Sequence, residues 1–398
     1  MTITSVCFLS HSCSLYNSIV TVRFLHCSVL LLAPSLVLVP FFRTNLAMTI
    51  ARETLPLNFL RSRSSDQNPD VAKASTTYID RFGANATADD RKKDATSMVN
   101  EYYDIVTDLY EYGWGQAFHF APRFAGETFY QSLSRHEHFL ALHGGFKAGT
   151  KILDIGCGVG GPLRNMVRFT GAEVTGVNNN AYQISRAKRH DERVGLGGLT
   201  RYLQCDFNSI PVPDASYDGA YAIEATCHAA DKTRCYGEIF RTLKPGAFFC
   251  GYEWIVTDKY DASNPVHRRI KHQIEKGNAL PDLETAAAVV TALKNAGFEV
   301  VASFDVIERF ESSPAKQLPW YHPLTASYTS LDGFKATPIG RWCTGVMLSV
   351  FEFVRLAPKG TQHATEVLQE AAVGLVDGGK HKVFTPAYFF AARKPLTA

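Results

Sequence analysis

The chain has 398 residues, of which 46% are hydrophobic, so it is long enough to bury one large core or two ordinary ones. Its 41 basic and 38 acidic residues nearly cancel, which argues against nucleic acid as a partner. The nine cysteines form no Cys-x-x-Cys pair and no metal-ligand spacing, so we expect reduced thiols and no bound metal.

The first 47 residues differ in composition from the rest of the chain. Residues 27–42 form an uncharged apolar run of 16 residues, which is shorter than the ~20 needed to span a membrane and is interrupted by Pro34. The segment 1–47 is therefore a signal anchor or interfacial segment, or an upstream extension absent from a protein whose translation begins at Met48. The ordinary polar sequence after Met48 favours the extension.

The next region, 48–126, combines a polar arm with an unusual aromatic stretch. Residues 61–97 are rich in Ser, Asp, Asn and Lys, which indicates a mobile arm. Residues 110–120 read YEYGWGQAFHF, and Gly113 and Gly115 work against a core helix there. The stretch is either a folded-over piece of aromatic core or a ring-lined pocket for a flat, apolar or cationic group.

From residue 127 onward, helical and strand-like segments alternate. A helix is expected over 127–143, and the strands lie at the start of 151–161 and within 172–177, 200–206, 217–225, 246–254 and 298–307. The helices between them lie around 161–169, 180–194, 231–243 and 284–296. This alternation predicts an α/β fold with a doubly wound, Rossmann-like parallel sheet.

A last strand at 382–394 follows a long insertion at 310–380, which we expect to be a helical cap because structureless loops of that length are uncommon. We therefore assign 127–308 to the core domain and 309–398 to the cap with the final strand.

The glycine turn LDIGCGVGGP indicates the kind of cofactor. Gly156, Gly158 and Gly161 satisfy the dinucleotide pattern G-x-G-x-x-G, which alone is a weak signal. Asp154 stands two residues before the first glycine, and the next strand ends at Asn178 where dinucleotide folds carry a carboxylate. Both features favour the D-x-G-x-G-x-G turn that class I methyltransferases use for S-adenosylmethionine.

Further cofactor positions follow in order along the chain. Gln183 and Asn178 carry amides that can bond ribose hydroxyls, and Asp206 follows the third strand, where an acid can accept from an adenine amino group. Any one of these residues, taken alone, is explained equally well as a turn residue or a helix cap. The candidate cofactor-binding residues are Asp154, Gly156, Cys157, Gly158, Gly160, Asn178, Asn179, Gln183, Asp206 and Phe207.

Five stretches, YEYGWGQAFHF, LDIGCGVGGP, GVNNNAYQ, YAIEATCHA and YEWIVTDKYD, together resemble the sterol 24-C-methyltransferase family from about Ser75 to Pro395. The resemblance implies methyl transfer from S-adenosylmethionine to C24 of a sterol with a 24(25) double bond, such as zymosterol or cycloartenol, in ergosterol-type biosynthesis. It also implies a sterol partner and peripheral contact with the cytosolic face of the endoplasmic reticulum or another internal membrane. The sequence is compatible with a homo-oligomer and does not specify one.

The implied chemistry gives the aromatic stretch a purpose. Methyl transfer leaves positive charge at C25, which water would quench, and a hydride shift and proton loss complete the reaction. Aromatic faces keep the site dry and stabilise a cation by ~2 kcal/mol or more per desolvated ring. The candidate catalytic rings are Tyr110, Tyr112 and Trp114. The candidate sterol-binding residues are Phe118, Phe120, Tyr221, Tyr252, Glu253 and Trp254.

A base must remove the proton, and four residues are candidates: Glu111, His119, Glu224 and His228. Glu224 and His228 are favoured because they follow the fourth strand, whose carboxyl end faces the crevice in this fold. Each of the four could instead be a structural hydrogen-bonding residue.

Three other functions compete with this interpretation. The chain could be another lipid-directed methyltransferase, such as a tocopherol methylase or cyclopropane-fatty-acid synthase, although these lack YEYGWG. It could also be a sterol-binding protein without catalysis or an NAD-dependent oxidoreductase. Asp154 in the glycine turn and Asp206 after the third strand argue against both of these.

Overall fold

The computed structural model of the chain describes residues 77–83, 86–311, 313, 316–325, 337–353 and 361–397. All of them belong to the unit Arg52–Ala398. The expectations for the apolar segment 1–47 and for residues 48–76 lie outside the described residues.

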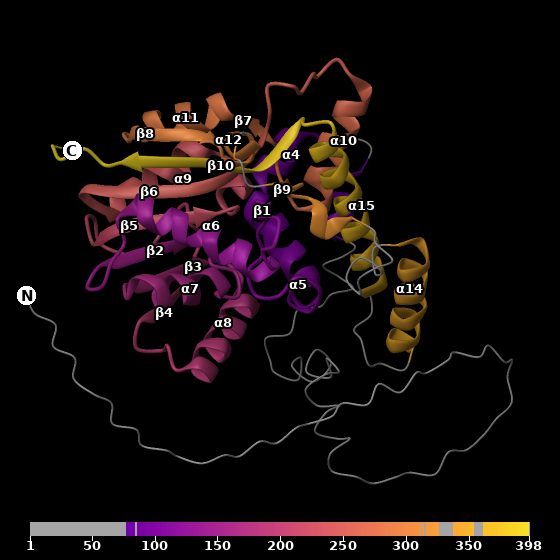
Figure 1. Cartoon of the computed structure of the whole chain (residues 1–398), viewed down its shortest axis with the longest axis horizontal. Helices are drawn as coiled ribbons and strands as arrows, with labels where there is room; N and C mark the ends of the chain where they lie inside the picture. The colour runs from indigo at the N-terminus through magenta and orange to yellow at the C-terminus, as the bar shows by residue number, and fades with distance from the viewer. Residues whose placement is uncertain are drawn as a thin grey trace, which may run out of the picture. The chain divides into compact units, whose positions relative to one another are not determined.

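A mixed sheet of eight strands forms the centre of the described part of the chain, in the order β4-β3-β2-β5-β6-β10-β8 with β7 beside the end of β6 (Figure 1). Strands β2 to β6 pair in parallel, whereas β10 runs antiparallel between β6 and β8. The strands are β2 Lys151–Ile155, β3 Glu173–Asn178, β4 Thr200–Gln204, β5 Tyr217–Ile223, β6 Leu243–Val256, β7 Glu284–Thr285, β8 Glu299–Asp305 and β10 Phe384–Arg393. The doubly wound sheet predicted from the sequence is confirmed.

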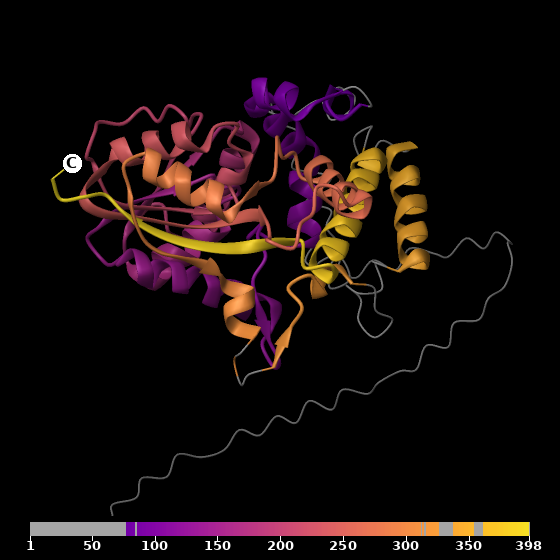
Figure 2. The ribbon, with the colours of Figure 1, turned by 90° about the horizontal axis from the view of Figure 1, so that it is seen from above.

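Helices cover both faces of this sheet (Figure 2). On one face, α9 and α11 pack Tyr236 and Leu293 into a hydrophobic cluster with the strands. On the other, α6 and α7 contribute Leu140 and Met166 to a second cluster. The helices are α4 Ala88–Lys93, α5 Ala95–Gly113, α6 Phe129–Gly144, α7 Gly161–Thr170, α8 Ala181–Val194, α9 Lys232–Thr242, α10 Pro265–Gly277, α11 Ala286–Asn295, α12 Val306–Glu311, α14 Pro338–Phe353 and α15 Thr361–Lys380.

Local signals set the ends of the predicted helices. Helix α8 begins after Asn180, whose Oδ1 accepts a hydrogen bond from the backbone N–H of Gln183 at 2.8 Å, and it ends at Gly195 with φ 70°. Both are strong boundary signals, because an asparagine satisfies a free N–H and a glycine tolerates a left-handed conformation. Helices α7, α8, α9 and α11 accordingly lie within two residues of their predicted bounds.

The expected mobile arm is wrong for its described part, because residues 86–97 contain α4 and the start of α5. A reciprocal capping box between Thr87 and Asp90 opens α4. Arg91 is buried and donates to Glu275 of α10 at 3.1 Å. The polar residues of this region therefore cap helix α4 and form an ion pair with α10.

Helix α5 continues to Gly113, so the first residues of the aromatic stretch are helical despite the glycine. Met98, Tyr102 and Val106 are buried on one side of this helix. Tertiary packing of such a face stabilises a helix more than residue propensity does.

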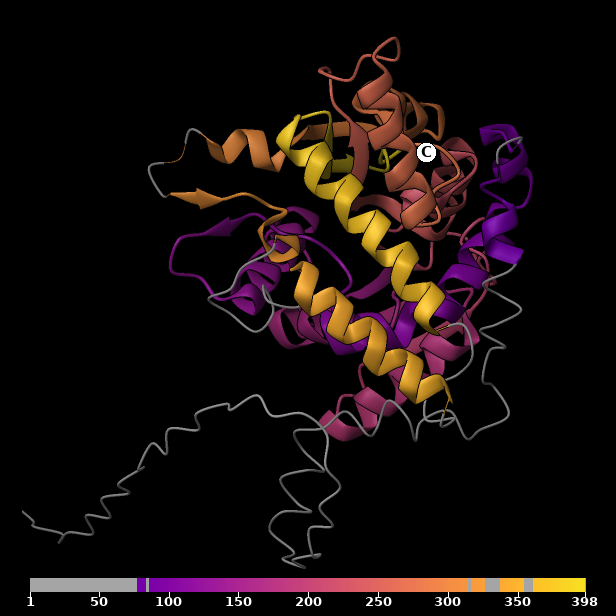
Figure 3. The same cartoon turned by 90° about the vertical axis from the view of Figure 1, so that its right-hand side faces the viewer.

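The described residues of the insertion before β10 are mainly helical, in α12, α14 and α15. Helices α14 and α15 lie side by side, and α15 packs against α10 (Figure 3). Helices α10 and α15 approach each other closely, because a Cβ at Gly277 of α10 would lie 2.4 Å from the Cβ of Ala371 of α15. Two short strands, β1 Arg123–Phe124 and β9 Gln317–Leu318, pair beside the cap. None of the described helices has the length and apolarity needed to cross a membrane.

Replacing Gly277 with alanine should destabilise the protein by ~1–3 kcal/mol, because the new methyl group meets the backbone of α15. Gly237 of α9 is the matched control, since a Cβ there has no neighbour within 4 Å. Gly237→Ala should stabilise the helix by roughly 0.5–1 kcal/mol. Urea unfolding of both variants measures the difference, and equal midpoints would refute the close crossing.

Candidate active site

Two adjoining cavities lie beyond the carboxyl ends of the parallel strands, which is where ligands bind in doubly wound folds. One has polar walls and an empty volume of about 1170 Å³, and the other is mainly aromatic and apolar with about 790 Å³. No group of three or more His, Cys, Asp or Glu in the described part of the chain is placed to hold a metal ion.

The polar cavity brings together seven of the ten predicted cofactor residues: Gly156, Gly158, Asn178, Asn179, Gln183, Asp206 and Phe207. In the glycine turn, Gly156 and Gly158 have φ of 76° and 53°. A Cβ at Gly156 would lie 2.4 Å from the Cβ of Ala225, whereas a Cβ at Gly158 would meet only the ring of Phe118 at 3.8 Å. The first glycine therefore permits close packing, and the second keeps the cavity open.

The other glycines of the turn serve packing. A Cβ at Gly160 would lie 2.7 Å from the hydroxyl of Tyr202, and one at Gly161 only 2.0 Å from the backbone oxygen of Gln116. Cys157 is buried beneath the turn. Neither Gly160 nor Cys157 is among the residues that line the polar cavity. The third glycine of the G-x-G-x-x-G pattern thus lets the aromatic stretch cross the turn.

Asp154 lies at the end of β2 and is also absent from the cavity lining. It is buried, and the hydroxyl of Tyr221, which is also buried, faces its carboxyl group. Burial, with the nearby carboxylate of Glu137, raises the pKa of Asp154 to about 7. Asp154 therefore lies behind the glycine turn and reaches a ligand in the polar cavity only through an ordered water.

The amides and the acid of the polar cavity are held by their neighbours. The side-chain N–H of Asn178 donates to Oε1 of Gln183 at 2.8 Å. Asp206 accepts from the backbone N–H of Asn208 at 2.8 Å and from the hydroxyl of Thr96 at 3.0 Å. Thr96 belongs to α5, which with α4 forms a wall that sequence reasoning missed, since it carries no motif.

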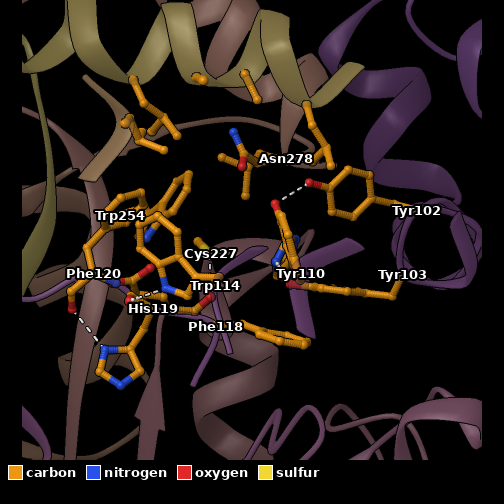
Figure 4. Close-up of a pocket in the computed structure, with 18 residues that line it drawn as sticks. Tyr102, Tyr103, Tyr110, Trp114, Phe118, His119, Phe120, Cys227, Trp254 and Asn278 are labelled. Carbon is orange, nitrogen blue, oxygen red and sulfur yellow. Dashed lines mark hydrogen bonds between the residues drawn. The ribbon is translucent and has the colours of Figure 1, made fainter. Parts of the chain in front are cut away.

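Rings of the aromatic stretch line the second cavity, namely Tyr110, Trp114, Phe118 and Phe120 (Figure 4). Tyr110 and Phe118 meet edge to face at 5.3 Å, and so do Trp114 and Phe120 at 5.1 Å. Trp254 of β6 lies on the same wall. The side chain of Tyr112 lies outside the described part of the structure.

Helices far away in the sequence complete the aromatic cavity. Leu368, Ala371 and Leu375 of α15 close one side, and Tyr102 of α5 contributes another ring. Sequence reasoning assigned α15 to the cap without naming these residues. Their apolar spacing of three and four along the helix is the signal that could have found them.

Four residues line both cavities: Tyr103, Phe118, Glu224 and His228. Glu224 directly follows β5, and His228 ends the short 3-10 helix η1 Thr226–His228. A group that passes from a ligand in one cavity to a ligand in the other would pass between these side chains. Tyr103 was missed by the sequence analysis.

Glu224 combines an uncommon backbone conformation with deep burial. Its φ is 53°, which is rare for a residue other than glycine, and its side chain is buried. Oε1 accepts from the backbone N–H of Phe120 at 2.7 Å. Burial raises the pKa of Glu224 to about 8, although the charge of His119 acts in the opposite direction. The free carboxyl is therefore mostly protonated at neutral pH.

The remaining candidate bases are engaged elsewhere. His119 Nδ1 contacts the carbonyl oxygen of Phe120 at 2.8 Å, and its Nε2 contacts Glu137 at 2.8 Å. Burial lowers its pKa, but Glu137 outweighs burial and the net pKa is raised, so no ring nitrogen is free to accept a proton. Glu111 bonds to Arg186 and His190 at 2.7 and 2.6 Å and lines neither cavity.

Three predicted sterol-binding residues line neither cavity: Tyr221, Tyr252 and Glu253. Tyr221 is fully buried within β5, and the hydroxyl of Tyr252 donates to the backbone oxygen of His136 at 2.9 Å. Glu253 accepts from Thr226 and Tyr236 behind the cavity. All three belong to strands before the strands end, so they support the site from within the protein core.

Two family models match the chain. The one described as a methyltransferase domain covers residues 153–251, and the one described as sterol methyltransferase C-terminal covers residues 331–396. The first spans the glycine turn and Glu224, and the second spans α14, α15 and β10.

Solved structures share the fold. A [4+2]-cyclase, SpnF, superposes with a TM-score of 0.54 at 22% identity and covers 76% of this chain and 96% of its own. A putative sarcosine dimethylglycine methyltransferase from Galdieria sulphuraria gives 0.52 at 20% identity and covers 72% and 97%. Both identities are low, so these likenesses establish the architecture alone.

Curated relatives are much more similar in sequence. The cycloartenol-C-24-methyltransferase of Arabidopsis thaliana is 49% identical over 307 residues, which are 77% of this chain and 90% of that protein. A sterol 24-C-methyltransferase of Saccharomyces cerevisiae is 44% identical over 315 residues, 77% of this chain and 81% of its own. The chain therefore belongs to the sterol 24-C-methyltransferase family, within the class I methyltransferase fold.

Proposed function

We propose that this chain transfers a methyl group from S-adenosylmethionine to C24 of a sterol that carries a 24(25) double bond, in ergosterol-type sterol biosynthesis. The observation that carries the proposal is the pair of adjoining cavities, one polar and one ring-lined, that share Tyr103, Phe118, Glu224 and His228. Family membership excludes the tocopherol and fatty-acid alternatives.

The polar cavity fits S-adenosylmethionine. Gly156 and Gly158 let the backbone approach a ligand, Asp206 offers an acid to an adenine amino group, and Asp154 supports the glycine turn from behind and binds an amine through water. Asn178 and Gln183 are placed for ribose hydroxyls. When bound, this cofactor supplies an electrophilic methyl group on a positively charged sulfur.

The ring-lined cavity fits the sterol side chain. Its volume of about 790 Å³ falls within the ~300–1,000 Å³ typical of small-molecule sites. The rings of Tyr110, Trp114, Phe118 and Phe120 exclude water, and we assign those of Tyr110, Trp114 and Phe118 to stabilising the positive charge at C25. We retain Tyr112 as a candidate ring from its place in the same stretch.

Several finer points rest on the same proposal. We assign 48–126 to the arm and aromatic segment, 127–308 to the cofactor-binding core and 309–398 to the sterol-binding cap. Relatives named for cycloartenol and for sterols in general support both substrate types, so a panel is needed to choose between zymosterol and cycloartenol. Peripheral contact with an internal membrane is part of the proposal because the substrate resides in membranes.

The function is tested by incubating the protein with labelled S-adenosylmethionine and a panel of sterols, and by identifying the products by mass spectrometry. A sterol methylated at C24 is expected only where the 24(25) double bond is present. A chain that methylates no sterol of the panel would contradict the proposal.

Replacing Gly158 with leucine should abolish cofactor binding without unfolding the protein. A Cβ at this position has open space around it, so a larger side chain projects into the polar cavity. The backbone strain at φ 53° costs roughly 1–2 kcal/mol, which the fold can absorb. Calorimetry of S-adenosylmethionine binding checks the result, and unchanged affinity in a folded variant would exclude the assigned cavity.

Cofactor affinity should depend on pH through Glu224. Below its pKa of about 8 the carboxyl is protonated, so a cationic ligand must displace the proton, whereas above that pH the carboxylate attracts the cation. His119 and Glu253 also act on this carboxyl, and they do so equally for either ligand. Affinity for S-adenosylmethionine should therefore rise roughly tenfold relative to S-adenosylhomocysteine between about pH 6.5 and 9.

The comparison of these two ligands cancels the interactions that they share, although the sulfonium also lowers the pKa of the ligand's own amino group. Glu224→Gln is therefore the control, and it should remove the part of the pH dependence that comes from the protein carboxyl. A ratio that stays constant with pH in the unaltered protein would show that Glu224 does not face the sulfur.

Phe118 and Phe120 offer a matched test of cation stabilisation, since Phe118 lines both cavities and Phe120 lines only the aromatic one. Phe118→Leu should lower kcat by more than it weakens sterol binding, because the ring acts only as charge appears. Phe120→Leu should mainly weaken sterol binding and lower the melting temperature.

Steady-state kinetics and binding of a sterol analogue with a protonated nitrogen at C25 measure both effects. In the unaltered protein the analogue should bind more tightly than the substrate, because it carries the positive charge of the intermediate. In Phe118→Leu this difference in affinity should disappear. Equal loss of analogue and substrate affinity would indicate that the ring serves packing alone.

A further inference from the structure

The phenol of Tyr103 lies where the two cavities meet, and it faces His228. Its oxygen is 3.2 Å from Nε2 of the histidine, and the two rings meet edge to face at 5.7 Å. Tyr103 comes from α5 and His228 from η1, so 125 positions of sequence separate the partners. The pair thus combines two titratable groups at the boundary that methyl transfer must cross.

The direction of the hydrogen bonds follows from a backbone group. Nδ1 of His228 lies 3.0 Å from the carbonyl oxygen of Ala279, which can only accept, so Nδ1 carries a proton. Burial lowers the pKa of His228 to about 4, although the Ala279 carbonyl opposes the shift, so the ring is neutral. Nε2 is then unprotonated and accepts from the hydroxyl of Tyr103.

This arrangement leaves the oxygen of Tyr103 able to accept a further proton while it releases its own. A phenol alone is a poor base, but one that passes its proton to an imidazole as it accepts another never carries a full charge. Glu224 is less suited, because its Oε1 is already engaged by the backbone N–H of Phe120 at 2.7 Å and its charge is used by the cationic cofactor.

We propose that Tyr103 and His228 together accept the proton that leaves the sterol in the last step, an assignment that rests on the proposed function. After the hydride moves from C24 to C25, the positive charge is at C24. A C–H bond of the transferred methyl group breaks, and its electron pair forms a double bond to C24. The proton goes to the Tyr103 oxygen, whose own proton moves to Nε2 of His228. The resulting imidazolium keeps its Nδ1–H bond to Ala279.

The test uses the full chain, a sterol with a 24(25) double bond, and S-adenosylmethionine with a fully deuterated methyl group. The unaltered protein should give a product that has lost one methyl deuterium. Tyr103→Phe keeps the ring and removes the oxygen, so turnover should fall about 100-fold. The remaining product should shift toward alcohols and other alkenes that retain all the methyl deuterium. His228→Gln should give the same shift, because an amide accepts a hydrogen bond without acting as a base.

Tyr102→Phe is the matched control, since it removes a hydroxyl from the neighbouring residue of the same helix. That hydroxyl donates to the backbone oxygen of Gly277 at 2.9 Å, so its loss should weaken sterol binding and leave the product ratio unchanged. Binding of S-adenosylhomocysteine to Tyr103→Phe should stay within about twofold of the unaltered protein.

A Tyr103→Phe variant with the original turnover and product ratio would overturn the assignment. A product shift in Glu224→Gln but not in Tyr103→Phe would overturn it as well, in favour of the carboxylate. Failure of the unaltered protein to methylate any sterol would instead contradict the proposed function itself, and this assignment with it.

Discussion

A buried ion pair behind the aromatic cavity fixes the turn on which the site depends. Glu253 of β6 has no exposed surface, and the ammonium group of Lys232 lies 3.3 Å from its Oε2. The hydroxyls of Thr226 and Tyr236 donate to the same oxygen at 2.9 and 2.8 Å. Lys232 also donates to the backbone oxygen of Thr226 at 2.9 Å. Removing either charge would leave the other unpaired in the interior, at a cost of ~3–5 kcal/mol. The pair therefore ties η1 to the sheet.

From this turn, two contacts reach the segments that form the cavities. Glu224 precedes η1 in a left-handed conformation that costs roughly 1–3 kcal/mol, and its carboxyl accepts from the backbone of Phe120. His228 ends η1 and bonds to Tyr103 of α5. The turn thus holds the aromatic stretch on one side and the N-terminal helix on the other. The strain at Glu224 persists because its neighbours determine its position from several directions.

Sequence signals predicted the parts of the molecule that are set locally. Helix α8, with Asn180 and Gly195 at its ends, is an example, and so is the turn around Gly156. Helix α5 was not predicted, because its stability comes from a buried face. Tyr103 was missed for a related reason, since its role depends on η1, far along the chain. Glu253 belongs to a motif that predicts a sterol-binding site, but it lines neither cavity, because a family motif includes residues that support a site as well as residues that line it.

The charges around the cavities are suited to a ligand that arrives with its own positive charge. Asp154 and Glu224 are buried carboxyls whose pKa values are raised to about 7 and about 8, chiefly by burial. The pKa of the buried His119 is raised by Glu137, which lies 2.8 Å away and balances any charge on the ring. In the free protein the two raised carboxyls hold protons and so avoid much of the cost of burying charge. Glu224 lines both cavities, so a cation that enters beside it favours loss of its proton and gains an anionic partner, and the burial that keeps the free carboxyl neutral also makes it respond to a ligand's positive charge.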